Sequence, residues 1–238
     1  MHSGFPGFPA EGIQFFRGLA RNNNRDWFQP RKSIYEEQVK RPMRELVEAV
    51  NGALLGFAPE YMTDPGKAIY RIYRDTRFSK DKTPYKTHIA ASFHRRGTTD
   101  HGDAGYYFAI SDKEVAVGGG VYMPDPKALL AIRNHIADNH VELRRILRGR
   151  SLKELLGDLQ GEQLSRVPKG FCAEHAAADL LKFKRFILYV ELEPELATSP
   201  ALYGEIVKRL RVMKPFLDFL TAPLRQRRRT LDARDLLA

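Results

Sequence analysis

The period of the hydrophobic pattern changes along this chain of 238 residues, and that change constrains the fold more than any other feature. Four segments in the middle are short, rich in Ile, Tyr, Phe and Val, and separated by turn-forming residues: 68–74, 87–94, 105–111 and 114–122. Short strands at such spacing are typical of an antiparallel meander. A fifth strand is predicted over 184–192, where the apolar run is almost continuous.

Helical periodicity lies on both sides of these strands. Amphipathic patterns cover 10–22, 35–54 and 202–220. Asp125 followed by Pro126 predicts another helix start, Pro42 predicts a kink or a restart of its helix, and we expect Pro223 to end the last long helix. The sequence therefore predicts an α+β fold, with an antiparallel sheet of about five strands flanked by N-terminal helices and a C-terminal helical half.

The chain contains no repeat, no flexible linker and no break in composition, so we expect one α+β domain over 1–238. Cys172 is the single cysteine, which excludes an intrachain disulfide and a zinc site built on thiolates. The first ten residues lack the features of a signal peptide, and no stretch approaches the ~20 apolar residues that span a bilayer. We expect a soluble cytoplasmic protein without a membrane partner, and its oligomeric state stays open.

The positive charge of the chain is concentrated in two segments. The formal net charge is +10, from 39 Lys and Arg against 29 Asp and Glu. Residues 67–96 contain nine basic and two acidic side chains, and residues 205–238 contain nine basic and four acidic ones. A local excess of this kind indicates an anionic partner. The basic C-terminal tail, 223–238, is the weaker signal, because a basic run at a chain end is typical of a solvated helix terminus.

Residues 71–88 carry the densest chemistry in the chain. Cations, hydroxyls and aromatic rings alternate around one expected loop, and arginine offers a planar donor fork that matches phosphate or carboxylate. The candidate ligand-binding residues are Arg71, Arg74, Arg77, Ser79, Lys80, Lys82, Tyr85 and Lys86. A second interpretation stays open, in which Asp75 and Asp81 pair with these arginines in an internal network that fixes the loop.

At this segment the chain resembles a family of conserved hypothetical proteins from bacteria and fungi, domain of unknown function 2461. Further matching motifs lie at 5–8, 22–28, 118–120 and 168–171. The resemblance covers roughly 4–220 and ends before the basic tail. The family has no established activity to carry over. The resemblance implies that its members share these residues, which strengthens the case for the loop.

The function that we predict is binding of a phosphorylated or other anionic ligand through the Arg/Lys-rich loop, without a metal or a cofactor. One alternative is an enzyme on a phosphorylated or carboxylated small molecule, with Asp75, Asp81 or His88 as acid or base. Whether the protein is an enzyme is left open. A second alternative is a nucleic-acid-binding protein, which an open basic groove continuous with 225–229 would favour.

Gly118, Gly119 and Gly120 follow a predicted strand and precede a helix, so their amides could cradle an anion. They match no phosphate-binding glycine motif, and close backbone packing is the interpretation that we favour for them.

Overall fold

A computed structural model describes residues 4–95 and 102–235 of the chain, with side chains described as far as Arg225. It confirms the α+β class, since about half of the chain is helical and the strands form one antiparallel sheet. The strands are β1 (His88–His94), β2 (Gly105–Ser111), β3 (Val115–Val121) and β4 (Phe186–Leu192). Their order in the sheet is β1-β2-β3-β4, so the first three form the predicted meander.

The tight link between β2 and β3 is closed by a serine rather than by an Asn-Gly pair. The Ser111 hydroxyl accepts hydrogen bonds from the backbone amides of Lys113 at 3.1 Å and Glu114 at 3.0 Å. A side chain that satisfies two turn amides compensates for the absence of a turn-specific dipeptide.

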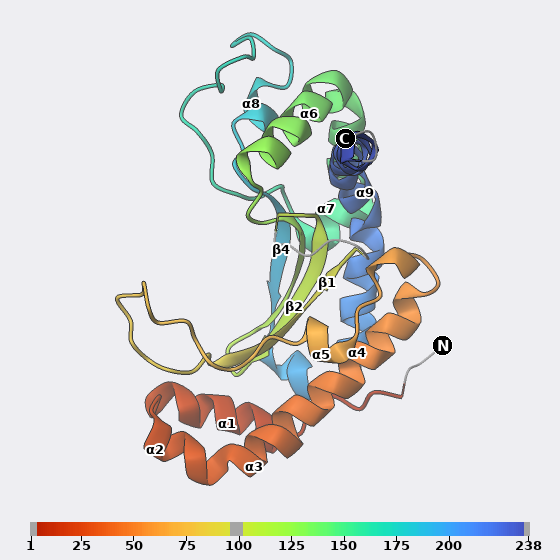
Figure 1. Cartoon of the computed structure of the whole chain (residues 1–238). Coiled ribbons are helices and arrows are strands. Elements are labelled where there is room, and N and C mark those ends of the chain that lie inside the picture. Colours follow the sequence, from red (N-terminus) through yellow and green to blue (C-terminus); the bar gives the residue numbers. More distant parts are fainter. Residues whose placement is uncertain (1–3, 96–101, 236–238) are drawn as a thin grey trace. The chain divides into compact units, whose positions relative to one another are not determined.

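The segment 68–74, which we expected as a strand, pairs with the chain around β1 at isolated points only. Ile69 forms a bridge with Ala91, and Tyr73 forms one with Tyr85. Between the two bridges, one segment has three residues (70–72) and its partner has five (86–90). The two extra residues on the partner interrupt the ladder. The result is an extended pair that leads into the 74–84 loop, which leaves the sheet and returns to it (Figure 1).

The described residues divide into two compact units. The first comprises the chain up to Phe93, Tyr107–Val117 and Glu191–Lys208, and the second comprises His94–Tyr106, Gly118–Val190 and the chain from Arg209 onward. The division falls within every strand of the sheet. The expectation of one domain over 1–238 stays a prediction.

The first unit is built from short helical segments. These are α1 (Ala10–Arg21), α2 (Arg25–Phe28), η1 (Gln29–Arg31), α3 (Lys32–Ile34), η2 (Tyr35–Lys40), α4 (Arg41–Leu54), η3 (Pro59–Tyr61), α5 (Pro65–Ala68) and η4 (Pro194–Thr198). Helix α1 lies beside α3 and η2 (Figure 1), and a Cβ atom on Gly12 would lie 2.1 Å from the Gln38 carbonyl oxygen. Glycine therefore permits this close approach of two helices.

Pro42 changes the helix around it without ending it. The preceding turn, η2, is a π-helix in which the Arg41 amide donates to the Glu36 carbonyl, five residues earlier. Because proline lacks an amide hydrogen and its ring crowds the preceding turn, the chain widens there and resumes as α4. The predicted kink is thus a π-helical turn.

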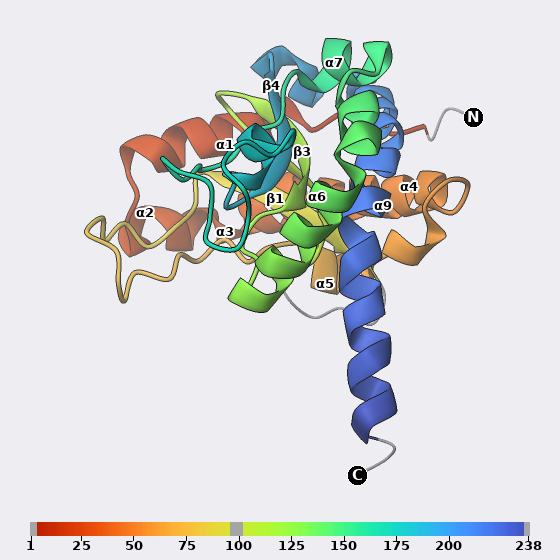
Figure 2. The same ribbon diagram turned by 90° about the horizontal axis from the view of Figure 1, so that it is seen from above.

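The second unit contains α6 (Pro126–Leu147), α7 (Arg150–Leu156), α8 (Ala178–Leu181) and most of α9 (Leu202–Asp235). The Asp125 carboxylate caps α6 as predicted, accepting a 2.8 Å hydrogen bond from the Ala128 amide. Helices α6 and α9 lie side by side (Figures 1 and 2), with the rings of His135 and Phe219 4.5 Å apart.

The prediction that Pro223 ends the last helix is wrong. Helix α9 includes both Pro215 and Pro223 and continues to Asp235, so the basic tail is helical through that residue. Each proline removes one intrahelical hydrogen bond, but Leu220 and Leu224, on either side of Pro223, are buried. Burial of these apolar side chains offsets the missing bond.

Within the described part of the chain, none of the helices combines the length and the apolar character needed to cross a membrane.

Candidate functional site

The loop of residues 74–84 is anchored at both of its ends. The Arg74 amide donates to the Pro84 carbonyl at 2.9 Å, and the Lys86 amide donates to the Ile72 carbonyl at 2.8 Å. The Asn23 side chain, from the turn between α1 and α2, donates to the Tyr85 carbonyl at 2.9 Å and accepts from the Tyr85 amide at 3.0 Å. Asn23 therefore pairs with Tyr85 as a neighbouring strand would.

Both acidic side chains of the loop pair with its arginines. The Arg77 guanidinium donates to the two Asp75 carboxylate oxygens at 3.0 and 2.8 Å, and Arg74 donates to Asp81 and to the Thr83 hydroxyl. These hydrogen bonds from Arg77 and Arg74 lower the pKa of Asp75 and of Asp81 to about 2 each. Asp75, Arg77 and Asp81 are exposed, so these ion pairs are at the surface.

The other candidates in the loop have different surroundings. Lys82 donates to the Thr76 carbonyl at 2.9 Å, and Lys80 is exposed. Tyr85 is 3% exposed and its ring stacks on Phe28 with centroids 4.2 Å apart, so its aromatic faces serve packing. Ser79 is half-buried, and its backbone amide donates to the Thr76 carbonyl.

A second group of predicted residues lies at the base of the loop. The Lys86 ammonium is 5.0 Å from the centre of the Tyr70 ring, and burial together with the charge of Arg71 lowers the Lys86 pKa. Burial, and then the charge of Lys86, lowers the pKa of His88 at the start of β1. Arg71 is exposed and forms no hydrogen bond or ion pair with any residue that the structure describes.

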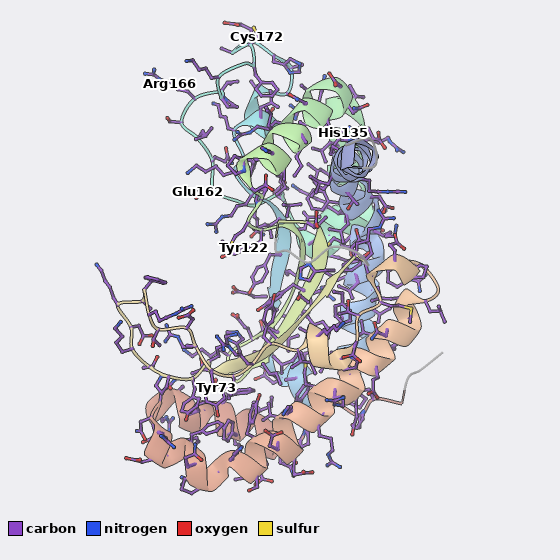
Figure 3. All side chains as sticks on the ribbon, in the orientation of Figure 1. Tyr73, Tyr122, His135, Glu162, Arg166 and Cys172 are labelled. Carbon is purple, nitrogen blue, oxygen red and sulfur yellow. The ribbon has the colours of Figure 1, made fainter. Side chains whose placement is uncertain are left out.

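Arg71 opens onto a cavity of about 240 Å³ in the first unit. Aromatic rings of Phe28, Tyr35, Tyr70 and Tyr73 form its walls, and Tyr73 is seen at the base of the loop in Figure 3. Burial raises the pKa of the Tyr35 hydroxyl, which stays protonated at neutral pH. The charged lining residues are Lys32, Glu36, Lys40, Arg44 and Arg71.

Most of these cations are not neutralised within the cavity. Lys40 pairs with Glu36 at 2.8 Å. Lys32, Arg44 and Arg71 form no ion pair with the described residues. Three positive charges without a carboxylate partner therefore surround an aromatic cavity.

Sequence reasoning identified Arg71 and missed Lys32, Lys40 and Arg44. A signal for them exists, since Lys32, Glu36, Lys40 and Arg44 follow one another at intervals of four residues. Such spacing places them on one helical face. That pattern is also typical of an ordinary solvated face, and only the presence of Arg71 in the lining of the same cavity distinguishes it from one.

The three glycines of the sheet are positions of close packing, as we favoured. Ideal Cβ atoms at Gly118 and Gly120 would lie 2.8 Å from the Leu188 carbonyl oxygen and 1.9 Å from that of Phe186, and one at Gly119 would lie 2.4 Å from the Met213 sulfur. Their backbones are thus enclosed by β4 and α9. No group of three or more His, Cys, Asp or Glu side chains in the described ranges could hold a metal ion.

A model of the family described as Conserved hypothetical protein (DUF2461) matches residues 11–219. The chain belongs to this family. The match confirms the resemblance seen in the motifs, includes every residue that lines the cavity at Arg71, and ends within α9. Comparisons with curated proteins and with solved structures find no match.

Proposed function

We propose that this member of the DUF2461 family binds a small, multiply charged anion, such as a phosphorylated compound, in the cavity at Arg71. The observation that carries the proposal is the group of three unneutralised cations, Lys32, Arg44 and Arg71, around one cavity. Phosphate groups carry more than one negative charge at neutral pH and accept several hydrogen bonds, which suits such a group.

The cavity restricts the size of the ligand. Its volume of about 240 Å³ is below the range of roughly 300–1,000 Å³ that is usual for drug-sized ligands. The aromatic walls at Tyr70 and Tyr73 suit a ring or another flat group beside the charged one. We therefore favour a compact phosphorylated metabolite over a long polymer.

The ion pairs within the loop support binding at Arg71 rather than at Arg74 and Arg77. Each of those two arginines already has a carboxylate partner, so an anion would have to displace Asp81 or Asp75. Among the described residues Arg71 has no hydrogen-bonded or ion-paired carboxylate to displace, and its charge acts on Asp75 only as a minor contribution to the lowered pKa of that carboxyl. We propose that Arg74 and Arg77 hold the loop in place beside the site.

The pKa values favour binding over acid–base catalysis by the loop. A carboxyl with a pKa of about 2, as at Asp75 and Asp81, is a weak general base at pH 7. His88 is the better candidate for proton transfer, and it does not line the cavity. An enzymatic role stays an alternative that requires a substrate to reach His88.

The proposal is tested by isothermal titration calorimetry with pyrophosphate and two matched variants. Arg71→Gln removes a charge from the cavity, whereas Lys67→Gln removes one from the exposed surface of α5, outside the lining. We expect Arg71→Gln to weaken binding about tenfold or more, because a charge-assisted hydrogen bond is lost. Lys67→Gln should bind nearly as the wild type. Absence of binding to the wild type, or equal losses in both variants, would contradict the proposal.

A further inference from the structure

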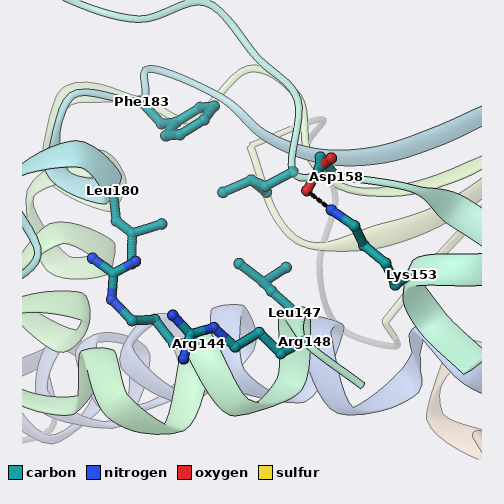
Figure 4. A pocket seen from close by; sticks show the side chains of 8 residues that line it. Arg144, Leu147, Arg148, Lys153, Asp158, Leu180 and Phe183 are labelled. Carbon is teal, nitrogen blue, oxygen red and sulfur yellow. Dashed lines mark hydrogen bonds and ion pairs between the residues drawn. The ribbon is translucent and has the colours of Figure 1, made fainter. Parts of the chain in front are cut away.

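The second unit contains a separate and larger cavity, of about 480 Å³. It lies between the end of α6, helices α7 and α8, and the chain at 158–159 and 183 (Figure 4). Leu147, Leu159, Leu180 and Phe183 give it apolar walls, and Leu147 points into it from α6. A volume within the range of roughly 300–1,000 Å³ is sufficient for a whole small molecule.

Phe183, the aromatic wall of this cavity, belongs to a backbone segment that hydrogen bonds fix in place. Arg133, only 8% exposed, donates from its guanidinium to the Phe183 carbonyl at 3.0 Å. The Phe183 amide donates to the Leu180 carbonyl at 3.3 Å, and residue 183 also forms a bridge with Gln163. The backbone that carries Phe183 is therefore fixed by hydrogen bonds, which reduces the ordering cost of binding at this wall.

The charges of this cavity leave one positive group without a partner. Arg144 donates to the Asp179 carboxylate at 2.6 and 3.1 Å and to the Ala176 carbonyl at 2.9 Å. Lys153 pairs with Asp158, as the dashed line in Figure 4 marks. The Arg148 side chain has no ion pair or hydrogen bond among the residues that the structure describes.

Arg148 is also well placed relative to the apolar wall. Arg144, Leu147 and Arg148 lie at positions i, i+3 and i+4 of the same helical stretch, so they share one face. Figure 4 shows the Arg148 side chain beside Leu147, on the same side of the cavity. One end of a ligand can thus meet the guanidinium while the rest lies against Leu159 and Phe183.

We infer that this cavity binds a monocarboxylate with an apolar body, whose carboxylate pairs with Arg148. A single excess positive charge matches a single negative charge, and a planar guanidinium matches a carboxylate with two parallel hydrogen bonds. The apolar walls exclude a bare anion as the preferred ligand, because burial of the body supplies most of the driving force. The site lies in the other unit from the cavity at Arg71 and does not rest on the function proposed for that cavity.

The test is calorimetric titration of the full chain with octanoate, octan-1-ol and acetate. Octanoate has both the chain and the charge, while each of the other two lacks one of them. We expect octanoate to bind with one-to-one stoichiometry and at least about tenfold more tightly than either of the others. Equal affinities for octanoate and octan-1-ol, or no binding of octanoate, would overturn the inference.

Substitutions at the C-terminal end of α6 locate the charge that is responsible. Arg148→Gln should weaken octanoate binding about tenfold and leave octan-1-ol unchanged. Arg145→Gln, the matched control, removes a neighbouring exposed charge that does not line the cavity, and it should have no effect. Leu159→Asp adds a negative charge to the wall and should abolish octanoate binding, with the melting temperature checking that the variant folds. Equal effects of Arg148→Gln and Arg145→Gln would contradict a specific carboxylate site.

The same variants distinguish a failure of the carboxylate site at Arg148 from a failure of the anion site proposed at Arg71. Arg71→Gln, which should weaken pyrophosphate binding, is expected to bind octanoate as the wild type does. Loss of octanoate binding in Arg71→Gln would show that the two cavities are not independent, and would overturn the inference of a distinct carboxylate site.

Discussion

Asp75 and Asp81 each hold an arginine of the same loop, and their roles follow from local geometry that composition does not reveal. Asp75 reaches Arg77 two residues on, and Asp81 reaches Arg74 across the turn. Two interpretations of the sequence were open: that the loop arginines bind a ligand, which we favoured, and that these carboxylates pair with them. Whether the carboxylates reach the arginines depends on the backbone conformation of the turn. A periodic pattern of apolar residues does not predict that conformation.

A titration tests this pairing residue by residue. In the wild type, NMR should give pKa values of about 2 for both Asp75 and Asp81. Arg77→Gln should return the pKa of Asp75 toward its ordinary value, because the donor hydrogen bonds are lost, and should leave Asp81 unchanged. Arg74→Gln should do the reverse. Since both pairs are exposed, neither variant should change the melting temperature by much at pH 7. Equal shifts of both carboxyls in either variant would show that the pairs are not separate.

His88 should make the stability of the protein depend on pH. Burial lowers its pKa in the folded state, so the unfolded chain binds more protons when the pH falls below about 6.5. The contribution of neutral His88 to the free energy of unfolding is fully present above the pKa that His88 has in the unfolded chain. It is lost as the pH falls toward the lower pKa of His88 in the folded protein. Melting temperatures between pH 7.5 and pH 5 should therefore fall less steeply for His88→Gln than for the wild type. His135, whose pKa burial also lowers, should contribute a separate part, which His135→Gln would remove. An unchanged slope in His88→Gln would contradict this assignment.

At the scale of elements, the sequence predicted those parts of the fold that a periodic pattern specifies. Helix α1, the meander and the Asp125 cap agree with it because apolar spacing and capping chemistry act locally. The extended segment 68–74 did not become a regular strand, because two extra residues on its partner break the pairing. The register between two paired segments depends on both of them, so the pattern of one segment alone does not predict it. For the same reason the sequence does not indicate that Arg71 shares a cavity with Lys32, Lys40 and Arg44, because they lie on two separate segments.

Substitution by alanine should have opposite effects at Gly120, in β3, and at Gly52, in α4. Gly120 has a φ of +134°, and its Cβ atom would overlap the Phe186 carbonyl, so Gly120→Ala should destabilise the protein by about 2 kcal/mol or more. Gly52 lies in α4 with no heavy atom within 4 Å of its Cβ position. Gly52→Ala should therefore stabilise the protein by about 0.5–1 kcal/mol. Urea denaturation of both variants provides the measurement, and destabilisation by Gly52→Ala would indicate that the helix is packed more tightly there.

At the scale of the whole molecule, a formal net charge of +10 attracts any polyanion, whatever the local sites recognise. Binding to nucleic acid driven by such charge weakens steeply with salt, since each neutralised phosphate releases counterions. Binding of a compact anion in a cavity depends on fewer charges and should weaken less. The salt dependence therefore separates nucleic-acid binding from the function proposed for the cavity at Arg71.

The measurement is fluorescence anisotropy of a labelled thymidine oligonucleotide at low salt and at about 150 mM. The full chain is compared with a chain that lacks residues 226–238, which removes four arginines and two aspartates and lowers the formal charge to +8. We expect weak oligonucleotide binding at low salt to disappear at about 150 mM in both chains, while pyrophosphate binding persists. Oligonucleotide binding that survives at the higher salt and requires residues 226–238 would instead favour nucleic acid as the partner, because a nonspecific attraction would not depend on one segment to that extent.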